Sequence, residues 1–393
     1  MTSVPRRRRT SLLPLTRPWL DTTEAQAVYD AVLGGDLIGD GRICRLAEAT
    51  LSAHLGVTRA LLLNSCTAAL ETAVHLSGAR GGEVILPSFT FVSCANAVIR
   101  GGARPVFADI DPHTLNIDPD AIARGITPST RAIIVVHYAG RACDMGAILA
   151  LAERHGLRVI EDAAHALGGM WHDRPLGTIG DFGCFSFHGT KDVVCGEGGA
   201  LVCRDAADTR RAEIIREKGT NRAAFLRGDV DKYTWVDEGN SFVLSDTLAA
   251  LLQPQLERLP AILERKRQLA AALTRRLEPV ADRLILPHEW AGIRTTWHLY
   301  PVLVPQERRD DMLAALRAQD IGAAFHYVPL HDSPYATEQF GYKTGDLPHT
   351  ERISASLIRL PLFAAMSDTD LDDVAEATIA AARQLLTPVD VRG

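Results

Sequence analysis

Strand-like and helix-like segments alternate through the first half of this 393-residue chain. Short apolar runs predict strands, and segments with apolar residues every three or four positions predict helices between them. The expected strands are residues 60–64, 84–86, 105–109, 133–137 and 159–162, and the expected helices include 68–76, 92–99 and 145–155. This order predicts a mostly parallel sheet wound by crossover helices. In such sheets ligands bind beyond the carboxyl ends of the strands.

The remainder of the chain predicts a second, smaller α/β unit. Residues 246–277 have a helical pattern that Pro254 and Pro260 interrupt, which predicts a kinked or broken connector. Beyond it we expect strands at 298–304 and 323–328 and helices at 310–317, 351–358 and 370–386. The chain is therefore divided into a basic tail expected to be disordered (1–15), a large domain (16–250) and a small C-terminal domain (251–393).

Composition excludes several classes of protein. The formal net charge of -6 gives no reason to expect nucleic acid as a partner. Seven scattered cysteines without a C-x-x-C pair indicate reduced thiols and a cytoplasmic protein, with neither a disulfide frame nor a metal site. No apolar run approaches the ~20 residues of a membrane span. Arg6–Arg9 lack the apolar segment that would follow them in a signal peptide.

An acid and a lysine follow two of the apolar runs in the stretch 158–203. Asp162 ends the first run, and Lys191 stands between the run GCFSF and the glycine-rich turn GEGG. A desolvated lysine amine has a lowered pKa and can form a Schiff base with an aldehyde. A carboxylate such as Asp162 could cap the next helix or pair with a pyridinium nitrogen. His165 could then bond the 3-oxygen of that ring or merely cap, and Ala164 is small enough to lie flat against the ring.

A possible anion site precedes the helix expected at 68–76. Hydroxyl residues before a helix are ordinary caps, but free N–H groups and the helix dipole also favour a phosphate there. The residues concerned are Ser65, Cys66 and Thr67, and Ser186 could add another hydroxyl. Phe91 follows a strand, where it could belong to the core or stack on a cofactor.

These motifs resemble a known family. EDAAHALG, GDFGCFSFHGTK and GEGGALV are similar to segments of the DegT/DnrJ/StrS sugar aminotransferases. The resemblance covers about residues 18–386 and implies the fold-type I architecture of enzymes that use pyridoxal 5'-phosphate (PLP). It implies a large domain with a mostly parallel sheet and a smaller C-terminal α/β domain.

The resemblance assigns roles to individual residues. Lys191 matches the Schiff-base lysine and catalytic residue, Asp162 the partner of the pyridine nitrogen, and His165 the residue near the 3-hydroxyl. Phe91 matches the stacking aromatic residue. The phosphate contacts match Cys66, Thr67 and Ser186. Asn240 matches a residue that reaches the phosphate of the partner subunit, which implies a homodimer with shared active sites.

Two further segments resemble the subgroup that aminates C4 of dTDP-4-keto-6-deoxyhexoses. They are REKGTNRAAFLRGDVDKYTWVDEG and FHYVPLH. The resemblance implies L-glutamate as amino donor and a dTDP-4-keto-6-deoxyhexose such as dTDP-4-keto-6-deoxyglucose as acceptor, in the biosynthesis of a deoxyaminosugar. The candidate substrate contacts are Lys218, Arg222, Lys232, His326, Tyr327 and His331.

Other functions stay open at this point. An aminotransferase acting at C3 would need the same cofactor residues. A PLP-dependent sugar dehydratase is disfavoured, because a histidine replaces the lysine in that branch. A non-catalytic sensor or scaffold on the same fold would not need Lys191, Asp162 and the phosphate contacts together.

Overall fold

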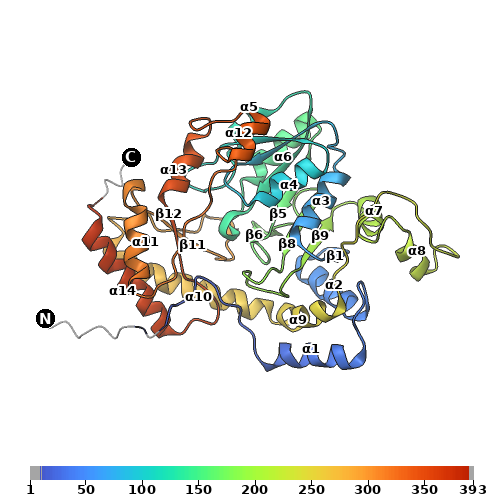
Figure 1. The fold of residues 1–393 in the computed structure, drawn as a ribbon, viewed down its shortest axis with the longest axis horizontal. Helices are drawn as coiled ribbons and strands as arrows, with labels where there is room; N and C mark the ends of the chain where they lie inside the picture. The colour runs from blue at the N-terminus through green and yellow to red at the C-terminus, as the bar shows by residue number, and fades with distance from the viewer. Residues whose placement is uncertain (1–8, 10, 389–393) are drawn as a thin grey trace.

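The larger unit is built around a seven-stranded sheet in the computed structural model, which describes residue 9 and residues 11–388 (Figure 1). Its strands are β1 (Ala60–Leu63), β2 (Glu83–Pro87), β3 (Arg104–Ala108), β4 (Thr130–Val136), β5 (Arg158–Asp162), β8 (Phe182–Ser186) and β9 (Gly199–Cys203). Their order is β1-β9-β8-β5-β4-β2-β3. The group from β8 to β3 is parallel, whereas β9 runs antiparallel to both β8 and β1. The predicted mostly parallel sheet is confirmed.

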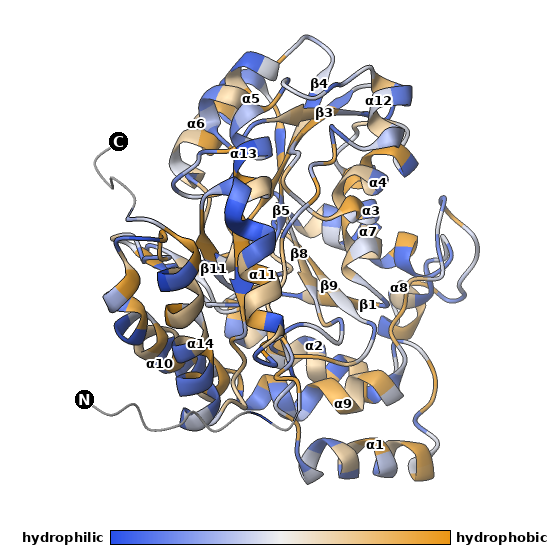
Figure 2. Ribbon diagram, turned by 60° about the vertical axis from the view of Figure 1, so that its left-hand side comes forward, coloured by the Kyte–Doolittle hydropathy of each residue, from blue (hydrophilic) through white to orange (hydrophobic). Residues whose placement is uncertain are grey.

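Helices cover both faces of this sheet. They are α2 (Arg42–Leu55), α3 (Cys66–Leu76), α4 (Val92–Arg100), α5 (Pro119–Gly125), α6 (Met145–His155), α7 (Ala206–Arg216) and α9 (Asp246–Glu257). Successive side chains of a strand point to opposite faces. In β4, Ile133 packs in a core with α2, α6 and α9, whereas Ile134 packs in a core with α3, α4 and α7. Burial on both sides explains the apolar runs, and the central strands are mostly orange in Figure 2.

The second unit is smaller and has its own core. It contains α10 (Leu259–Leu277), β11 (Tyr300–Leu303), α11 (Arg309–Arg317), β12 (Leu357–Leu360) and α14 (Asp368–Leu385), with β11 and β12 paired antiparallel. Leu273, Val302, Leu316 and Val374 are buried together in it. The remaining elements are α1 (Thr22–Gly34), η1 (Tyr138–Gly140), β6 (Met170–Trp171), β7 (Arg174–Pro175), α8 (Arg222–Arg227), η2 (Glu278–Val280), β10 (Ile293–Arg294), η3 (Gln306–Arg308), α12 (Pro334–Phe340) and α13 (Pro348–Ser356).

The connector between the units is broken, as its prolines predict. Helix α9 ends at Glu257 and α10 begins at Leu259, with Pro254 inside α9 and Pro260 in the first turn of α10. Leu252 of α9 packs beneath the large sheet, and Leu269 of α10 packs in the small core. Since α9 spans residue 250, we propose that the boundary between the domains lies within α10.

Two predictions for the small unit are wrong. Residues 357–360 form strand β12 although a helix was expected through residue 358, and residues 323–328 make only an isolated bridge between Ala324 and Arg359. Helix α13 runs directly into β12, so one apolar run contains both elements. A short apolar run does not distinguish helix from strand by its period. Residues 357–360 form a strand because β12 pairs with β11.

The expected disordered tail is also wrong over residues 11–15. Leu13 is buried in the small core, and its N–H donates to the carbonyl of Asp320 at 2.8 Å. Gly322 in turn donates to the carbonyl of Leu13 at 2.8 Å. The side chain of Arg9 pairs with Asp370 at 2.9 Å. Residues 1–8 and 10 lie outside the described part of the chain, and so does that part of the prediction.

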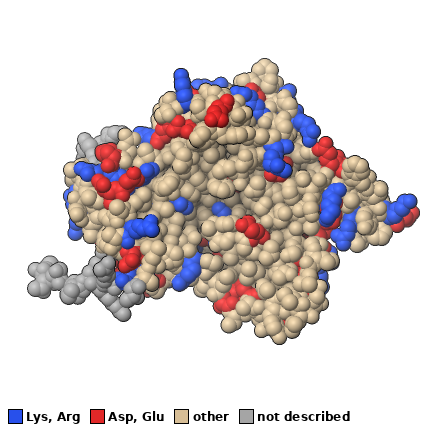
Figure 3. Space-filling model, viewed as in Figure 1, with Lys and Arg blue, Asp and Glu red and all other residues tan. Residues whose placement is uncertain are grey.

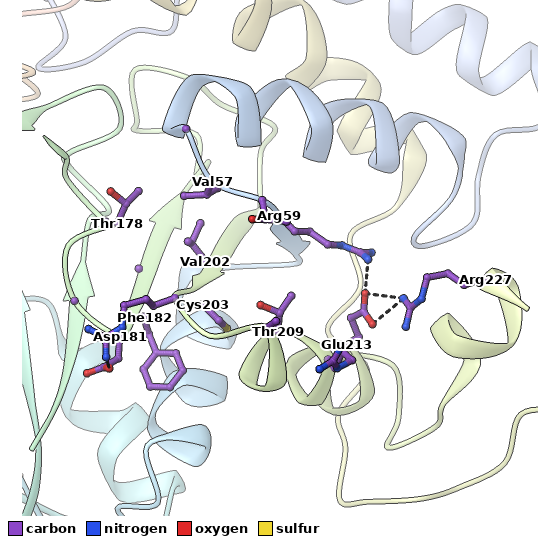
Figure 4. A pocket seen from close by; sticks show the side chains of 18 of the residues that line it. Val57, Arg59, Thr178, Asp181, Phe182, Val202, Cys203, Thr209, Glu213 and Arg227 are labelled. Atoms are coloured by element: carbon purple, nitrogen blue, oxygen red, sulfur yellow. Dashed lines mark hydrogen bonds and ion pairs between the residues drawn. The ribbon is translucent and has the colours of Figure 1, made fainter. Parts of the chain in front are cut away.

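The segment 217–240 projects from the body of the molecule and carries α8 (Figure 1). A cluster of ion pairs connects this segment to the body. The cluster borders a cavity of about 450 Å³ that lies near Phe182, at the opposite end of β8 from Ser186. Arg227 of α8 reaches both oxygens of the buried Glu213, at 3.1 and 2.9 Å. Arg59 approaches Glu213 from the other side at 2.5 Å (Figure 4). One buried carboxylate therefore attaches α8 of the projecting segment to the body of the molecule.

No helix within residues 11–388 combines the length and the apolar character that crossing a membrane requires.

Candidate active site

A cavity of about 600 Å³ lies at the carboxyl ends of β5 and β8, where residues of the small unit face the large sheet. The face shown in Figure 3 is hollowed near its middle. Most of the residues predicted for the site line this cavity, namely Cys66, Thr67, Phe91, Asp162, Ala164, His165, Ser186, Lys191, His326 and Tyr327. Tertiary structure thus brings together residues that are far apart in the chain.

Lys191 stands in a tight turn between β8 and β9. Its N–H donates to the carbonyl of His188 at 2.9 Å, and Gly189 donates to Gly196 at 2.9 Å across the turn. Burial lowers the pKa of the Lys191 amine, although the nearby charge of Asp162 acts in the opposite direction. The neutral, nucleophilic amine is therefore more populated than in a solvated lysine.

Asp162 is the last residue of β5, and two donors hold its carboxylate. The backbone N–H of Ala164 donates to Oδ1 and the thiol of Cys94 donates to Oδ2, each at 3.0 Å. Burial raises the pKa of Cys94, and Asp162 raises it further. The thiol therefore keeps its proton and donates it. No local pattern singles out Cys94, because it lies on α4 and meets Asp162 only through tertiary packing.

The opposite end of the cavity is suited to an anion. The hydroxyl of Ser65 accepts from the N–H of Ala68 at 3.0 Å and so caps α3. The N–H groups of Cys66 and Thr67 have no acceptor among the described residues and stand at the positive end of the helix dipole. Gly199 passes so close that a Cβ there would lie 2.4 Å from the nitrogen of Cys66. Free N–H groups, a helix N-terminus and the hydroxyls of Thr67 and Ser186 together suit a phosphate.

Aromatic rings border the space between these two ends. Phe91 precedes α4 with 59% of its surface exposed, and its side chain lines the cavity. His165 lies beside His298, with ring centroids 4.5 Å apart. The N–H of Ala139 donates to Nδ1 of His165 at 3.4 Å, so Nε2 of His165 carries the hydrogen in the neutral ring. Burial lowers the pKa of His165 and keeps the ring neutral.

The small unit supplies His326, Tyr327 and Arg359. His326 stacks on Tyr327 with ring centroids 3.6 Å apart, and its Nδ1 lies 3.3 Å from the hydroxyl of Tyr138. Arg359 lies on β12 and also lines the cavity, with its guanidinium donating to the carbonyl of Phe325 at 3.0 Å. Arg359 and His298 were not among the residues predicted for the site. Arg359 directly follows residues 357–358, which were wrongly predicted to be helical. His298 begins an expected strand whose pattern does not distinguish it from core.

Five predicted contacts do not line this cavity. His331 is fully buried, and its ring nitrogens meet Ser88 at 2.7 Å and Glu351 at 2.9 Å. Lys218 and Asn240 border a separate cavity of about 460 Å³. Arg222 and Lys232 lie on the projecting segment 217–240, and neither lines the site. Within one chain, only His326 and Tyr327 of the proposed substrate contacts reach the cavity.

The residues present fit PLP. Its pyridine nitrogen needs a carboxylate, which Asp162 supplies, and its aldehyde needs an amine, which Lys191 supplies. Its phosphate matches the free N–H groups at the start of α3. The thiol of Cys94 and the N–H of Ala164 hold the carboxylate of Asp162 in place, where it can pair with a ring nitrogen.

Comparison with known proteins agrees with this geometry. The family model described as the DegT/DnrJ/EryC1/StrS aminotransferase family matches residues 18–378. The spore coat polysaccharide biosynthesis protein SpsC of Bacillus subtilis is 38% identical over 380 residues, covering 94% of this chain and 97% of SpsC.

Solved structures give the same result. The aminotransferase TlmJ from Streptoalloteichus hindustanus has a TM-score of 0.88 and 33% identity, covering 95% of this chain and all (100%) of that one. The putative sugar aminotransferase Spr1654 from Streptococcus pneumoniae, in a pyridoxamine phosphate (PMP) form, has a TM-score of 0.88 and 26% identity, covering 95% of this chain and 100% of that one. The chain belongs to the DegT/DnrJ/EryC1/StrS family and is a PLP-dependent sugar aminotransferase.

Proposed function

We propose that this enzyme transfers the amino group of L-glutamate to C4 of a dTDP-4-keto-6-deoxyhexose, giving a dTDP-4-amino-4,6-dideoxyhexose. The observation that carries the aminotransferase chemistry is that Lys191 and Asp162 face one cavity from the ends of two parallel strands. The choice of C4 is supported by the resemblance of residues 216–239 and 325–331 to the C4 subgroup. Amination at C3 is the alternative outcome that product analysis distinguishes.

PLP, when bound, supplies an electron-withdrawing ring that stabilises negative charge on the carbon beside the transferred nitrogen. Asp162 would hold the protonated ring nitrogen, and Nε2 of His165 would be the donor available for the 3-oxygen. Lys191 would hold the aldehyde carbon through its amine. When another amine has displaced it, the free amine of Lys191 would be the group that accepts a proton from Cα of glutamate and returns it, and it would act in the opposite direction with the keto sugar. One lysine is therefore both the covalent anchor and the general acid/base.

Arg359 supplies a positive charge to the side of the cavity formed by the small unit. Arg359 is largely buried, and burial lowers its pKa while Tyr138 and Tyr327 act in the opposite direction. We assign to Arg359 an anionic group of either substrate. His326 and Tyr327 would contact the sugar, whereas Lys218, Arg222 and Lys232 would meet the diphosphate only from a partner subunit or after movement of residues 217–240.

A homodimer is part of this proposal. Asn240 is exposed and outside the cavity of its own chain, which is consistent with a role at the phosphate of a partner subunit. The cytoplasm is the proposed location, and all seven cysteines are free thiols in the structure, as a reducing compartment would keep them. The name of SpsC suggests surface polysaccharide as one destination of the product.

A spectroscopic experiment tests the proposal. The purified enzyme should show the absorbance band of the lysine-bound cofactor, convert to the PMP spectrum with L-glutamate, and return with dTDP-4-keto-6-deoxyglucose. Lys191→Ala should remain folded and lose turnover. Turnover by that variant would refute the role of Lys191, and an NMR spectrum of the product showing nitrogen at C3 would refute the regiochemistry. Failure of glutamate to convert the wild-type enzyme would refute the donor.

A further inference from the structure

Directly after Lys191, a row of three polar side chains extends into the cavity from the small unit. Lys266 of α10 places its amine 2.8 Å from Oδ1 of Asp192. Oδ2 of Asp192 lies 3.1 Å from Nδ1 of His298, and His298 lines the cavity. Lys266 is only 1% exposed and His298 only 5%. Three polar side chains from three distant parts of the sequence are thus held together beside the reactive lysine.

The contacts among Lys266, Asp192 and His298 determine which ring nitrogen of His298 carries the hydrogen. An ionised carboxylate only accepts hydrogen bonds. Burial alone would raise the pKa of Asp192, but Lys266 and His298 outweigh burial and lower it to about 2. Asp192 is therefore ionised, and Nδ1 of His298 is the donor. Burial lowers the pKa of His298 to about 4, in spite of Asp192, so the ring is neutral and its Nε2 is an acceptor.

The neighbouring histidine has the opposite arrangement. Nδ1 of His165 accepts from Ala139, which leaves Nε2–H as a donor. The two rings lie with centroids 4.5 Å apart and an interplanar angle of 30°. Nε2 of His298 has no hydrogen-bond partner among the residues that the structure describes, whereas Nδ1 is occupied by Asp192. The cavity is therefore given one imidazole donor and one imidazole acceptor side by side.

We infer that Nε2 of His298 accepts a hydrogen bond from the free amine of Lys191, and that Asp192 and Lys266 are positioning residues that hold His298 in the required tautomer. This inference rests on the proposed function, because the amine of Lys191 is free only when another amine has displaced it. A hydrogen bond to Nε2 would limit the rotation of the long lysine side chain and aim its amine during proton transfer.

A purely structural role for the Lys266–Asp192 ion pair accounts for fewer of these contacts. Lys266 already donates to the carbonyls of Leu362 at 3.0 Å and His298 at 3.3 Å, which ties α10 to the rest of the small unit without a carboxylate. Burying an additional charged pair is costly unless further hydrogen bonds satisfy it. A structural pair also gives no reason for an imidazole acceptor to face the cavity.

The tautomer is tested without the cofactor. In the apo-protein labelled with ¹⁵N-histidine, the signal that disappears in His298→Leu should show a neutral ring protonated at Nδ1. In Asp192→Asn the amide can donate to Nδ1, so the same signal should change to the Nε2-protonated form. A wild-type ring protonated at Nε2, or an unchanged ring in Asp192→Asn, would overturn the inference.

The role is tested by the rate at which glutamate converts the loaded enzyme. We expect Asp192→Asn to slow this step by at least about 10-fold, with little change in the glutamate concentration that gives half the maximal rate. His298→Gln can keep an acceptor near the position of Nε2 and should be faster than His298→Leu. Asp181→Asn controls for loss of a buried carboxylate, because Asp181 pairs with Arg204 at the far end of β8.

The experiment distinguishes failure of the proposed function from failure of the inference about His298. If wild-type enzyme is not converted by glutamate at all, the proposed function is wrong. If wild-type enzyme is converted, and Asp192→Asn reacts at the wild-type rate, the proposed function stands and the inference about His298 is wrong. Equal rates for His298→Gln and His298→Leu would also contradict it.

Discussion

His298 should make the stability of this enzyme sensitive to mild acid, and replacing it should remove part of that sensitivity. The folded protein keeps the His298 ring neutral because it is buried, and its pKa is lowered to about 4. In the unfolded chain the same ring has a pKa near ~6.5. Between these two values the unfolded state binds a proton that the folded state does not. The contribution of His298 is therefore present above pH ~6.5 and is lost as the pH falls towards 4.

The size of the effect follows from the two pKa values. A ring with pKa ~6.5 unfolded and about 4 folded disfavours folding by about 2 kcal/mol more at pH 5 than at pH 7. The charged and titratable groups around His298 act on both proteins and largely cancel in a comparison; they are Asp192, Lys266, Lys191, His165 and His326. The informative quantity is therefore the difference between wild type and His298→Gln, measured at each pH.

The assay is urea unfolding of the apo-proteins at a fixed protein concentration between pH 7 and pH 5. Whatever His298→Gln costs at pH 7, its disadvantage relative to wild type should shrink by about 2 kcal/mol at pH 5. His349→Gln removes an exposed ring and serves as the matched control. A difference between wild type and His298→Gln that stays constant over this range would refute a neutral, buried His298.

Three further outcomes follow from the contacts. Asp162→Asn should leave the fold intact but slow conversion by glutamate at least about 100-fold, because a neutral amide does not hold the ring nitrogen protonated; a near-normal rate in stopped-flow absorbance would contradict this. Arg216→Met removes the guanidinium 2.6 Å from the buried Glu48, leaves only Arg59 at 3.8 Å, and should cost roughly 3–5 kcal/mol in thermal unfolding; unchanged unfolding would show that the pair adds nothing. Glu213→Gln should weaken the attachment of residues 217–240 and speed proteolytic cleavage there, and equal cleavage rates would argue against it.

The large sheet could be predicted because its signal is local and repeated. Each strand of the parallel group is a short apolar run, and runs buried on both faces remain recognisable without knowledge of their neighbours. The end of β5 and the turn after β8 could be located in the same way, and the structure has Asp162 as the last residue of β5 and Lys191 in the turn that follows β8. Residues 357 and 358 were assigned wrongly because the local pattern does not separate the end of α13 from the start of β12.

The sequence alone determined the chemistry that this chain can perform: a parallel sheet, an acid and a lysine at its carboxyl edge, and hydroxyls before a helix. Only the tertiary structure decided how these groups are tuned. Cys94 meets Asp162, Lys266 meets Asp192 and Arg359 enters the cavity through packing between elements far apart in the chain. The local pattern around each of these residues shows that it lies on a helix or a strand. It does not show which distant group it meets, because that depends on how whole elements pack against one another.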